Sequence, residues 1–530
     1  MSKKITIFDS TLRDSAQAEG VSFSVEDKIK IVKALDELGV EYIEAGNPGS
    51  NPKDLEFFER IKSVKLNNSK IAAFGSTRRR DISPSEDGNL RALLGAGTEA
   101  VAIFGKSWDF HVTDIINATL KENLEMIYDT IAYLKEKGKY VIFDAEHFFD
   151  GYKENPEYAL KTLDSAYQAG ADCLCLCDTN GGTFPQEIYN ITKLVKDKFE
   201  ITVGVHCHND CGMAVANSVM AVQAGAEHIQ GVMTGFGERC GNTNLSTVIP
   251  NLQCKLDYKC IPDENISKLT HIARKVSEIA NLQLSIREPY VGKCAFAHKG
   301  GMHIDGVCKN SRSFEHIDPS IVGNERHFLT SEVAGRTTIL STVQKIIPGV
   351  EKNSPETGKV IEKLKELEYE GYQFEGADGA FELLIRKTLG KYKPFFELEN
   401  FKIIGEHPPY GDGRTASAVI KIKVDGRSEI TAAEGDGPVN ALDRALRKAL
   451  EVFYPNLSDV HLVDYKVRVL DGNSATASKV RVLIESSDGT DNWTTVGVSV
   501  DIIEASWIAL VDSLEYKLIK DIEQKFRTFL

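Results

Sequence analysis

The first 250 residues alternate between short apolar runs and longer segments in which apolar residues recur every three or four positions. Short apolar runs are typical of buried strands, and the longer spacing is typical of amphipathic helices. We therefore predict eight strands, at residues 5–8, 42–45, 71–74, 100–104, 140–143, 172–177, 201–206 and 228–233.

Helix start and stop signals support this alternation. Ser24 followed by Asp27 resembles a capping box, apolar residues then follow at helical spacing, and Gly39 ends the run. Eight strand–helix units of about 30 residues suit a TIM (β/α)8 barrel of about 250 residues, and residues 1–264 are its predicted extent. The other predicted helices cover residues 52–66, 114–137, 155–169, 185–199 and 211–224.

The pattern changes beyond the barrel. Residues 265–394 are mainly helical and polar, which predicts linker subdomains. From residue 395 to residue 530, glycine-punctuated strands predict a separate α+β domain. Its expected strands lie near residues 402–405, 418–424, 429–433, 465–470, 479–485 and 494–501, and its helices near 439–453 and 504–527.

Composition and charge exclude several classes of protein. A net charge of −14 and a longest basic run of three residues, Arg78 to Arg80, argue against sequence-independent nucleic-acid binding. We expect no membrane span and no signal peptide, and hence a cytoplasmic protein, because no apolar stretch reaches about 18 residues. Ten cysteines without C-x-x-C pairs predict no disulfide or structural-zinc framework.

Polar side chains follow most of the predicted strands at their carboxyl ends. In a TIM barrel these ends share one mouth, where active sites lie. We therefore expect the polar residues to converge there. They are Asp9, Arg13, Asp14, Glu44, Glu146, His147, Asp178, Thr179, His206, His208, Glu238, Arg239 and Asn242.

His206 and His208 are the strongest chemical signal among them. Residues two apart on a strand face the same way, about 6.6 Å apart, so two imidazoles can converge on one cation. Imidazole and carboxylate ligands suit Zn, Mn, Co or Fe. Taken alone, the pair also fits two partly buried histidines bonded to backbone carbonyls; the shared mouth favours the metal site. A further glycine-flanked loop carries His303.

Several motifs, in order, resemble the isopropylmalate, homocitrate and citramalate synthase family, which condenses acetyl-CoA with 2-oxo acids. Leu12-Arg13-Asp14 with Gln17 and Lys28 matches the family's first signature, and residues 203–216 match its second. Residues 237–242 match its glycine-rich loop, and residues 435–442 resemble its regulatory, dimer-forming domain. The match covers nearly the whole chain.

The resemblance implies a role for each candidate residue. A divalent metal, Mn, Mg, Zn or Co, would be bound by Asp14, His206, His208 and Asn242. Arg13, Glu146 and His303 would be catalytic: Arg13 would stabilise the oxyanion, and the other two would promote removal of the acetyl-CoA methyl proton. Arg13, Glu44 and Thr179 would bind the substrate.

Within the family, stretches such as residues 48–54, 146–152 and 503–507 look most like the members that use pyruvate. The resemblance then implies a homodimer with isoleucine as effector of the C-terminal domain. Discrimination between 2-oxo acids rests on pocket size, because a methylene is worth only about 1–3 kcal/mol. A substrate of the isopropylmalate type, 2-oxoisovalerate, is the alternative at this stage.

The chain departs from the family at Ser15-Ala16, where glycine and then glutamate or threonine are usual. Ala16 has no carboxylate, which disfavours a homocitrate-forming role. Two other classes stay open: a related metal-dependent lyase, aldolase or carboxyltransferase, and an amino-acid-sensing module whose barrel has lost catalysis.

Overall fold

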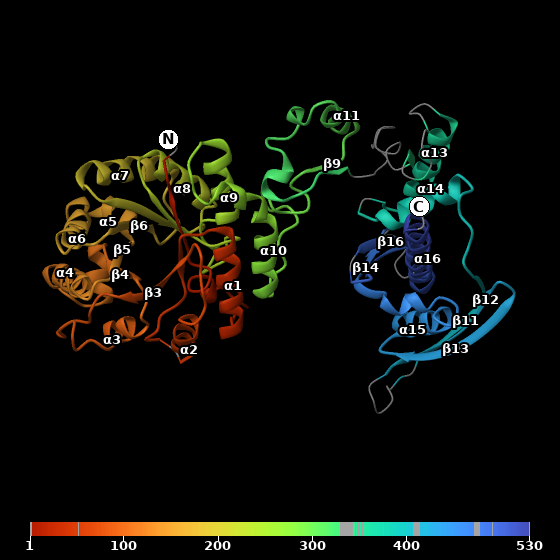
Figure 1. The fold of residues 1–530 in the computed structure, drawn as a ribbon, viewed down its shortest axis with the longest axis horizontal. Helices are drawn as coiled ribbons and strands as arrows, with labels where there is room; N and C mark the ends of the chain where they lie inside the picture. The colour runs from red at the N-terminus through yellow and green to blue at the C-terminus, as the bar shows by residue number, and fades with distance from the viewer. Residues whose placement is uncertain are drawn as a thin grey trace. The chain divides into compact units, whose positions relative to one another are not determined.

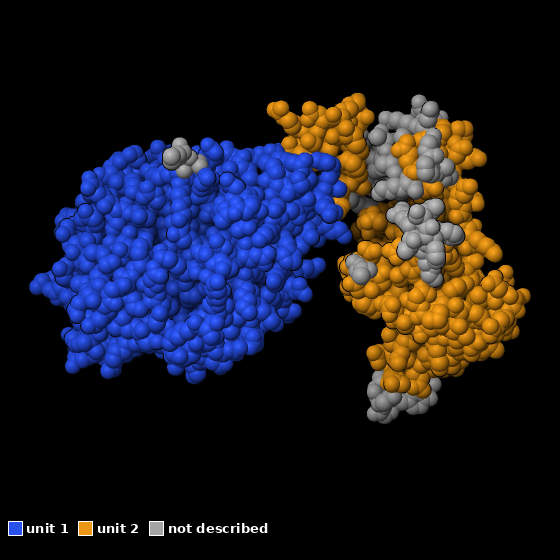
Figure 2. Space-filling view, viewed as in Figure 1, with its two compact units in different colours: residues 1–296, 316–326 blue, residues 297–315, 327–530 orange. Residues whose placement is uncertain are grey.

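The computed structural model describes residues 3–50, 52–328, 343–344, 346, 350, 354–374, 376–405, 407, 414–470, 478–489 and 491–528. The chain forms two compact units, coloured separately in Figure 2. Unit 1 contains residues 1–296 and 316–326, and unit 2 contains residues 297–315 and 327–530. The bounds of the three domains expected from the sequence stay a prediction.

Unit 1 is built on a closed barrel of eight parallel strands in sequential order, which confirms the predicted fold class (Figure 1). Strand β8 pairs with β1, so that Phe8 lies beside Gln230 and Asp9 beside Gly231. All eight predicted strands are present. They are β1 (Thr6–Asp9), β2 (Tyr42–Glu44), β3 (Lys70–Ser76), β4 (Ala100–Lys106), β5 (Tyr140–Glu146), β6 (Cys173–Asp178), β7 (Thr202–Cys207) and β8 (His228–Gly231).

Helices surround the barrel, and local sequence explains where they begin and end. In α1 (Val25–Leu38), Ser24 and Asp27 form the predicted capping box, and Gly39 ends the helix at φ 95°. A glycine there avoids the steric cost of the left-handed conformation. The others are α2 (Pro52–Ile61), α3 (Gly88–Gly95), α4 (Leu120–Glu136), α5 (Phe148–Glu154), α6 (Pro156–Gln168), α7 (Pro185–Lys198), α8 (Ala214–Gln223), α9 (Leu245–Pro250) and α10 (Leu269–Ile279).

Several predicted helices are shorter in the structure, and two of them differ most. The helix expected over residues 52–66 ends at Ile61. The helix expected over residues 114–137 is interrupted: a π-helical turn, His111–Ile115, precedes it, Asn117 lies at φ 52°, and α4 starts only after Thr119. The Thr119 hydroxyl accepts a hydrogen bond from the Glu122 amide, which is a regular N-cap and explains the later start.

The barrel interior is filled by side chains, as expected for eight strands. Cys173 and Cys175 of β6 pack there beside Phe8, Tyr42 and other small or aromatic residues. Both thiols are fully buried, and burial raises the pKa of each well above its ordinary value. They behave as small apolar side chains.

Unit 2 ends in two successive β-β-β-α segments. The first consists of β11 (Glu397–Gly405), β12 (Ala416–Val424), β13 (Arg427–Gly435) and α15 (Pro438–Leu450). The second consists of β14 (His461–Val469), β15 (Val480–Ser487), β16 (Asn492–Ser499) and α16 (Ile502–Thr528). Each sheet is antiparallel, and both helices contribute to one apolar core, which confirms the expected α+β class.

Shorter elements precede these segments in unit 2. A two-stranded sheet pairs β9 (Ala297–His298) with β10 (His327–Phe328), and α11 (Gly301–Lys309) lies between them in the sequence. Helices α13 (Pro355–Glu370) and α14 (Asp378–Thr388) share an apolar cluster with Val496 of β16. Within the described residues, no helix is both long enough and apolar enough to cross a bilayer.

Asp36 of α1 generates a prediction about barrel stability. Its carboxylate is buried and accepts hydrogen bonds from the amides of Asn67, Asn68 and Ser69 at 2.7–3.0 Å. Replacement by alanine leaves the buried Ser69 amide and the two partly buried amides of Asn67 and Asn68 without this acceptor, at a cost of about 1–3 kcal/mol. We expect Asp36→Ala to lower the free energy of unfolding of the barrel by this amount in urea denaturation.

Glu37→Ala is the matched control, because the Glu37 carboxylate is half exposed and lies 3.5 Å from Lys268 at the surface. Surface ion pairs of this kind contribute little. Equal destabilisation by both substitutions would contradict the role of the Asp36 carboxylate.

Candidate active site

Three predicted metal ligands meet at the mouth of the barrel. His206 lies at the end of β7, His208 follows it, and Asp14 follows β1. The Nε2 atoms of the two histidines are 3.3 Å apart, and Asp14 Oδ2 is 3.6 Å from His206 Nε2. All three side chains are buried, and their candidate ligand atoms lie within 4.8 Å of one another. This arrangement can hold one cation.

The protonation of the cluster suits a cation. Burial lowers the pKa of His206 and lowers that of His208 to about 3, so both imidazoles are neutral and each can offer a lone pair. Burial opposes ionisation of Asp14, but the Arg13 guanidinium and the hydrogen bond from Asn242 hold its pKa well below its usual range. The cluster therefore presents one carboxylate and two neutral imidazoles.

Asn242 adds a fourth donor to this set. Its backbone pairs with that of His208, and its Nδ2 donates to Asp14 Oδ1 at 2.9 Å. Its Oδ1 is buried and has no hydrogen-bond partner among the described residues. A buried amide oxygen without a donor is costly, and a cation would satisfy it. The donor set fits a divalent metal with N and O ligands.

Arg13 is held rigidly beside the cluster. Its Nε donates to Glu44 Oε2 at 2.7 Å, and its Nη1 lies 2.9 Å from Asp14 Oδ2. The guanidinium also lies 4.1 Å from the centre of the Phe74 ring. Glu44 is fully buried and also accepts from Ser10 Oγ at 2.5 Å. Two carboxylates and an aromatic face thus orient one guanidinium towards the mouth.

A cavity of about 190 Å³ opens over this cluster. Thr179 lines it, and its Oγ1 accepts a hydrogen bond from the His147 amide at 2.8 Å, which leaves the hydroxyl proton for a ligand. Glu146 lines it as well and forms an ion pair with Lys106. Phe74 and Phe104 form a stacked pair in its wall, with ring centres 5.2 Å apart.

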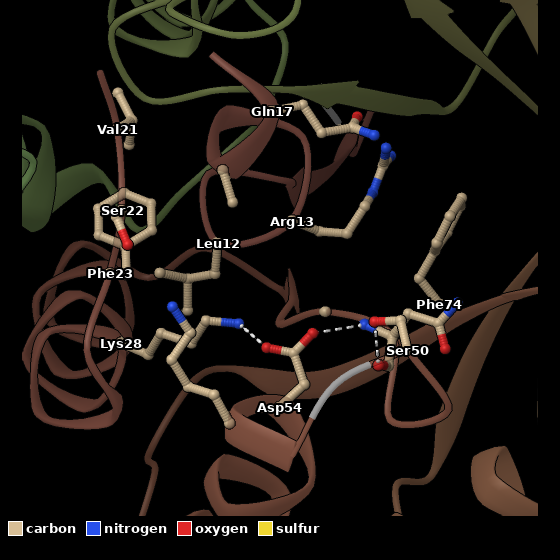
Figure 3. A pocket seen from close by; sticks show the side chains of 14 residues that line it. Leu12, Arg13, Gln17, Val21, Ser22, Phe23, Lys28, Ser50, Asp54 and Phe74 are labelled. Atoms are coloured by element: carbon tan, nitrogen blue, oxygen red, sulfur yellow. Dashed lines mark hydrogen bonds and ion pairs between the residues drawn. The ribbon is translucent and has the colours of Figure 1, made fainter. Parts of the chain in front are cut away.

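A second cavity of about 360 Å³ shares Arg13, Gln17 and Phe74 with the first (Figure 3). In this view the Gln17 amide and the Arg13 guanidinium approach each other above the buried Lys28–Asp54 pair. Lys28 Nζ lies 2.5 Å from Asp54 Oδ1 and donates to the Ala45 carbonyl at 2.8 Å. The two cavities are therefore neighbours with Arg13 in the wall of each.

Two other predicted features are His303 and the pair Ser15-Ala16. His303 belongs to α11 in unit 2, is exposed, and stacks on Phe314 with ring centres 4.1 Å apart. Ser15 does not have a positive φ, so serine fits the backbone there, and its hydroxyl donates to the Phe236 carbonyl at 3.0 Å. Ala16 lines the second cavity only.

Some residues of the site did not come from sequence reasoning. Lys106, Phe104, Asp144 and Gln230 all lie on barrel strands close to the cluster. Lys106 ends β4 and is the kind of polar strand-end residue that the barrel rule can find. Asp144 directly follows the predicted strand at residues 140–143, so the same rule can find it. Gln230 lies within the predicted strand at residues 228–233, and only its pairing across strands makes it part of the site.

Matches to known families and proteins cover almost the whole chain. Residues 4–276 match the HMGL-like family, residues 290–371 the homocitrate synthase post-HMGL domain-like family, and residues 375–518 the LeuA allosteric (dimerisation) domain. The (R)-citramalate synthase of Aquifex aeolicus is 53% identical over 525 residues, with 99% of both chains covered.

Two other known proteins are less similar to this chain. A protein of Methanopyrus kandleri, named as a probable 2-isopropylmalate synthase, is 32% identical, with 96% of this chain and 98% of that protein covered. The hydroxymethylglutaryl-CoA lyase structure from Pseudomonas aeruginosa is 20% identical with a TM-score of 0.46, covering 54% of this chain and 95% of its own.

The geometry of the cluster predicts stoichiometric cation binding. We expect the protein to bind one Mn²⁺ per chain, measured as loss of the free-ion signal in electron paramagnetic resonance. His208→Ala and Asp14→Asn should weaken binding by more than the roughly 10–100-fold that follows loss of an outer hydrogen-bond partner. The exposed His271, also in unit 1, provides the control His271→Ala. Unchanged affinity in the two cluster variants would refute this assignment.

Proposed function

We propose that this chain, which belongs to the HMGL-like family and to the group of its (R)-citramalate synthases, condenses acetyl-CoA with pyruvate to give (R)-citramalate and CoA. The observation that carries the proposal is the convergence of Asp14, His206 and His208 on one point beside Arg13. Similarity over almost the entire chain supports the same activity.

Substrate binding follows from the donors around the cluster. A divalent cation held by Asp14, His206, His208 and the amide oxygen of Asn242 would act as a Lewis acid towards the keto oxygen and carboxylate of the 2-oxo acid. The Thr179 hydroxyl, whose oxygen already accepts from the His147 amide, would donate its proton to that carboxylate. The chain would thus orient the keto oxygen and the single carboxylate of the substrate.

Charge develops on the keto oxygen when the new carbon–carbon bond forms. The Arg13 guanidinium is pre-oriented by Glu44 and Asp14, so it can donate to this oxygen without reorganising. Because it is held in a buried site, its electrostatic contribution is larger than it would be in water. Glu44 would act mainly by positioning Arg13.

The acetyl methyl group must lose a proton before it can attack. We infer that Glu146 and His303 promote this step, with Lys106 setting the position of Glu146 through their ion pair. The methyl carbon then adds to the keto carbon of pyruvate, and water cleaves the thioester C–S bond to release CoA. A base near the reacting proton typically contributes about 10²–10⁴-fold.

The wall of the smaller cavity favours pyruvate over 2-oxoisovalerate. The stacked rings of Phe74 and Phe104 occupy space that a branched side chain would need. At about 190 Å³ the cavity lies below the roughly 300–1,000 Å³ typical of larger ligands. The lower identity to the 2-isopropylmalate synthase agrees with this choice.

The C-terminal segments would serve dimerisation and control. Residues 375–518 match the LeuA allosteric (dimerisation) domain, which supports a homodimer. We propose isoleucine as the effector, because an isoleucine pathway that starts from citramalate would be controlled by its end product.

The activity can be tested directly by CoA release. We expect the purified protein with Mn²⁺ or Mg²⁺ to release CoA from acetyl-CoA with pyruvate at a higher kcat/KM than with 2-oxoisovalerate. EDTA should abolish the release. A preference for 2-oxoisovalerate would move the activity to isopropylmalate formation, and absence of turnover with every 2-oxo acid would overturn the condensing reaction.

The aromatic wall generates a separate prediction about specificity. Phe104→Ala should enlarge the cavity and lower the preference for pyruvate over 2-oxoisovalerate, since each methylene accommodated is worth about 1–3 kcal/mol. We expect a change of about tenfold or more in the ratio of the two kcat/KM values. Phe184→Ala removes an exposed ring at the start of α7 and is the control. An unchanged ratio in Phe104→Ala would exclude this wall as the determinant.

A further inference from the structure

A chain of hydrogen bonds leads from the metal-ligand cluster into the barrel interior. His206 Nδ1 lies 2.9 Å from Gln230 Oε1, and Gln230 Nε2 donates to Asp144 Oδ1 at 2.7 Å. The three residues come from β7, β8 and β5, and each side chain is buried. His206 and Gln230 are direct neighbours in the β7–β8 register, so the contact follows from strand pairing.

The direction of each bond follows from the chemistry of its partners. A carboxylate is an acceptor only, so Asp144 draws the NH₂ end of the Gln230 amide towards itself. The amide oxygen then faces His206, where it can only accept, and the imidazole proton must lie on Nδ1. His206 Nε2 is left as an unprotonated lone pair facing His208 and Asp14. The chain therefore selects the tautomer that can bind a cation.

The other polar groups around Asp144 preserve this direction. The Cys175 thiol also hydrogen-bonds the Asp144 carboxyl, and Arg13 and Glu44 are the charged groups that act on it. Burial raises the pKa of Asp144 to about 7, and in the structure its Oδ1 accepts from Gln230 Nε2. His208 Nδ1, by contrast, is buried without a hydrogen-bond partner among the described residues. Of the two histidines, His206 is the one whose tautomer is imposed through its other ring nitrogen.

We propose that Gln230 and Asp144 are positioning residues that hold His206 in its Nδ1–H tautomer and thereby set the affinity of the site for a divalent cation. This inference rests on the cation site of the proposed function. Gln230 acts on His206 directly, and Asp144 acts through Gln230 by preventing rotation of its amide. Neither residue ligates the cation.

Two near-isosteric substitutions separate these roles. Gln230→Met keeps the length of the side chain but offers no oxygen to Nδ1–H. Asp144→Asn keeps the shape but can present either an oxygen or an NH₂ group, so the Gln230 amide is free to rotate. The control is Gln253→Met, which removes a glutamine amide that bonds the Ile261 carbonyl and Asp263, away from the cluster.

The first measurement is Mn²⁺ affinity by electron paramagnetic resonance, with thermal unfolding of each variant as a check on folding. We expect Gln230→Met to raise the Kd by about 10–100-fold, as loss of an outer hydrogen-bond partner does elsewhere. Asp144→Asn should raise it by a smaller factor, and Gln253→Met should leave it unchanged. A Kd in Gln230→Met equal to that of the wild type overturns the proposal.

The second measurement needs no cation. In protein labelled with ¹⁵N-histidine and freed of metal, long-range ¹⁵N–¹H NMR reports which ring nitrogen of His206 carries the proton, and the signal is assigned by its loss in His206→Ala. The wild type should show the Nδ1–H form, and Gln230→Met a mixture or the Nε2–H form. If His206 carries its proton on Nε2 in the cation-free wild type, the proposed role of Gln230 and Asp144 is wrong.

The two readouts distinguish failure of this inference from failure of the proposed function. One outcome is that the wild type binds no Mn²⁺ while its His206 carries the proton on Nδ1 and Gln230→Met changes that tautomer. The cation site would then be wrong, and the positioning role of Gln230 would be supported. If the wild type binds Mn²⁺ and both variants keep its affinity and tautomer, the site stands and the positioning role is wrong.

Discussion

The hydrogen bonds between β8 and β1 close the barrel, and the candidate site depends on that closure. They place Phe8 beside Gln230 and Asp9 beside Gly231, residues more than 200 positions apart in the sequence. The loop after β1 then carries Arg13 and Asp14 to the end of β7, where His206 and His208 lie. Without the pairing of β8 with β1, the Asp14 carboxylate would not meet the imidazoles of His206 and His208.

Barrel closure also brings several charged side chains together in a buried site, which lowers the free energy of unfolding. Arg13, Asp14 and Glu44 lie together with little access to water, and their hydrogen bonds offset only part of the desolvation of three charged groups. Burial raises the pKa of Asp9 and Asp144 to about 7 in the same region. Such arrangements are expected where a site must present fixed charges to a reacting group. The surrounding barrel, with its large apolar core, supplies the stability that this centre lacks.

Local patterns in the sequence were sufficient for most of the elements. All eight strands follow from short apolar runs, and α1 from its capping box and Gly39, because these signals act within a few residues. The same reasoning overextended the helix at α2 and joined the π-helical turn at His111–Ile115 to α4. The break at Asn117 comes from a left-handed residue that the helical spacing of apolar positions does not reveal.

By itself, the sequence determined the order of the strands and helices, the polar residues at the strand ends, and the placement of His206 and His208 on one face, because each depends on local periodicity. Only the tertiary structure decided that Glu44 bonds Arg13, that Asn242 keeps a free buried oxygen, and that Gln230 links His206 to Asp144. These features bring together side chains from different strands and loops of the barrel. Their geometry is set by barrel closure and strand register, to which no local spacing of residues corresponds.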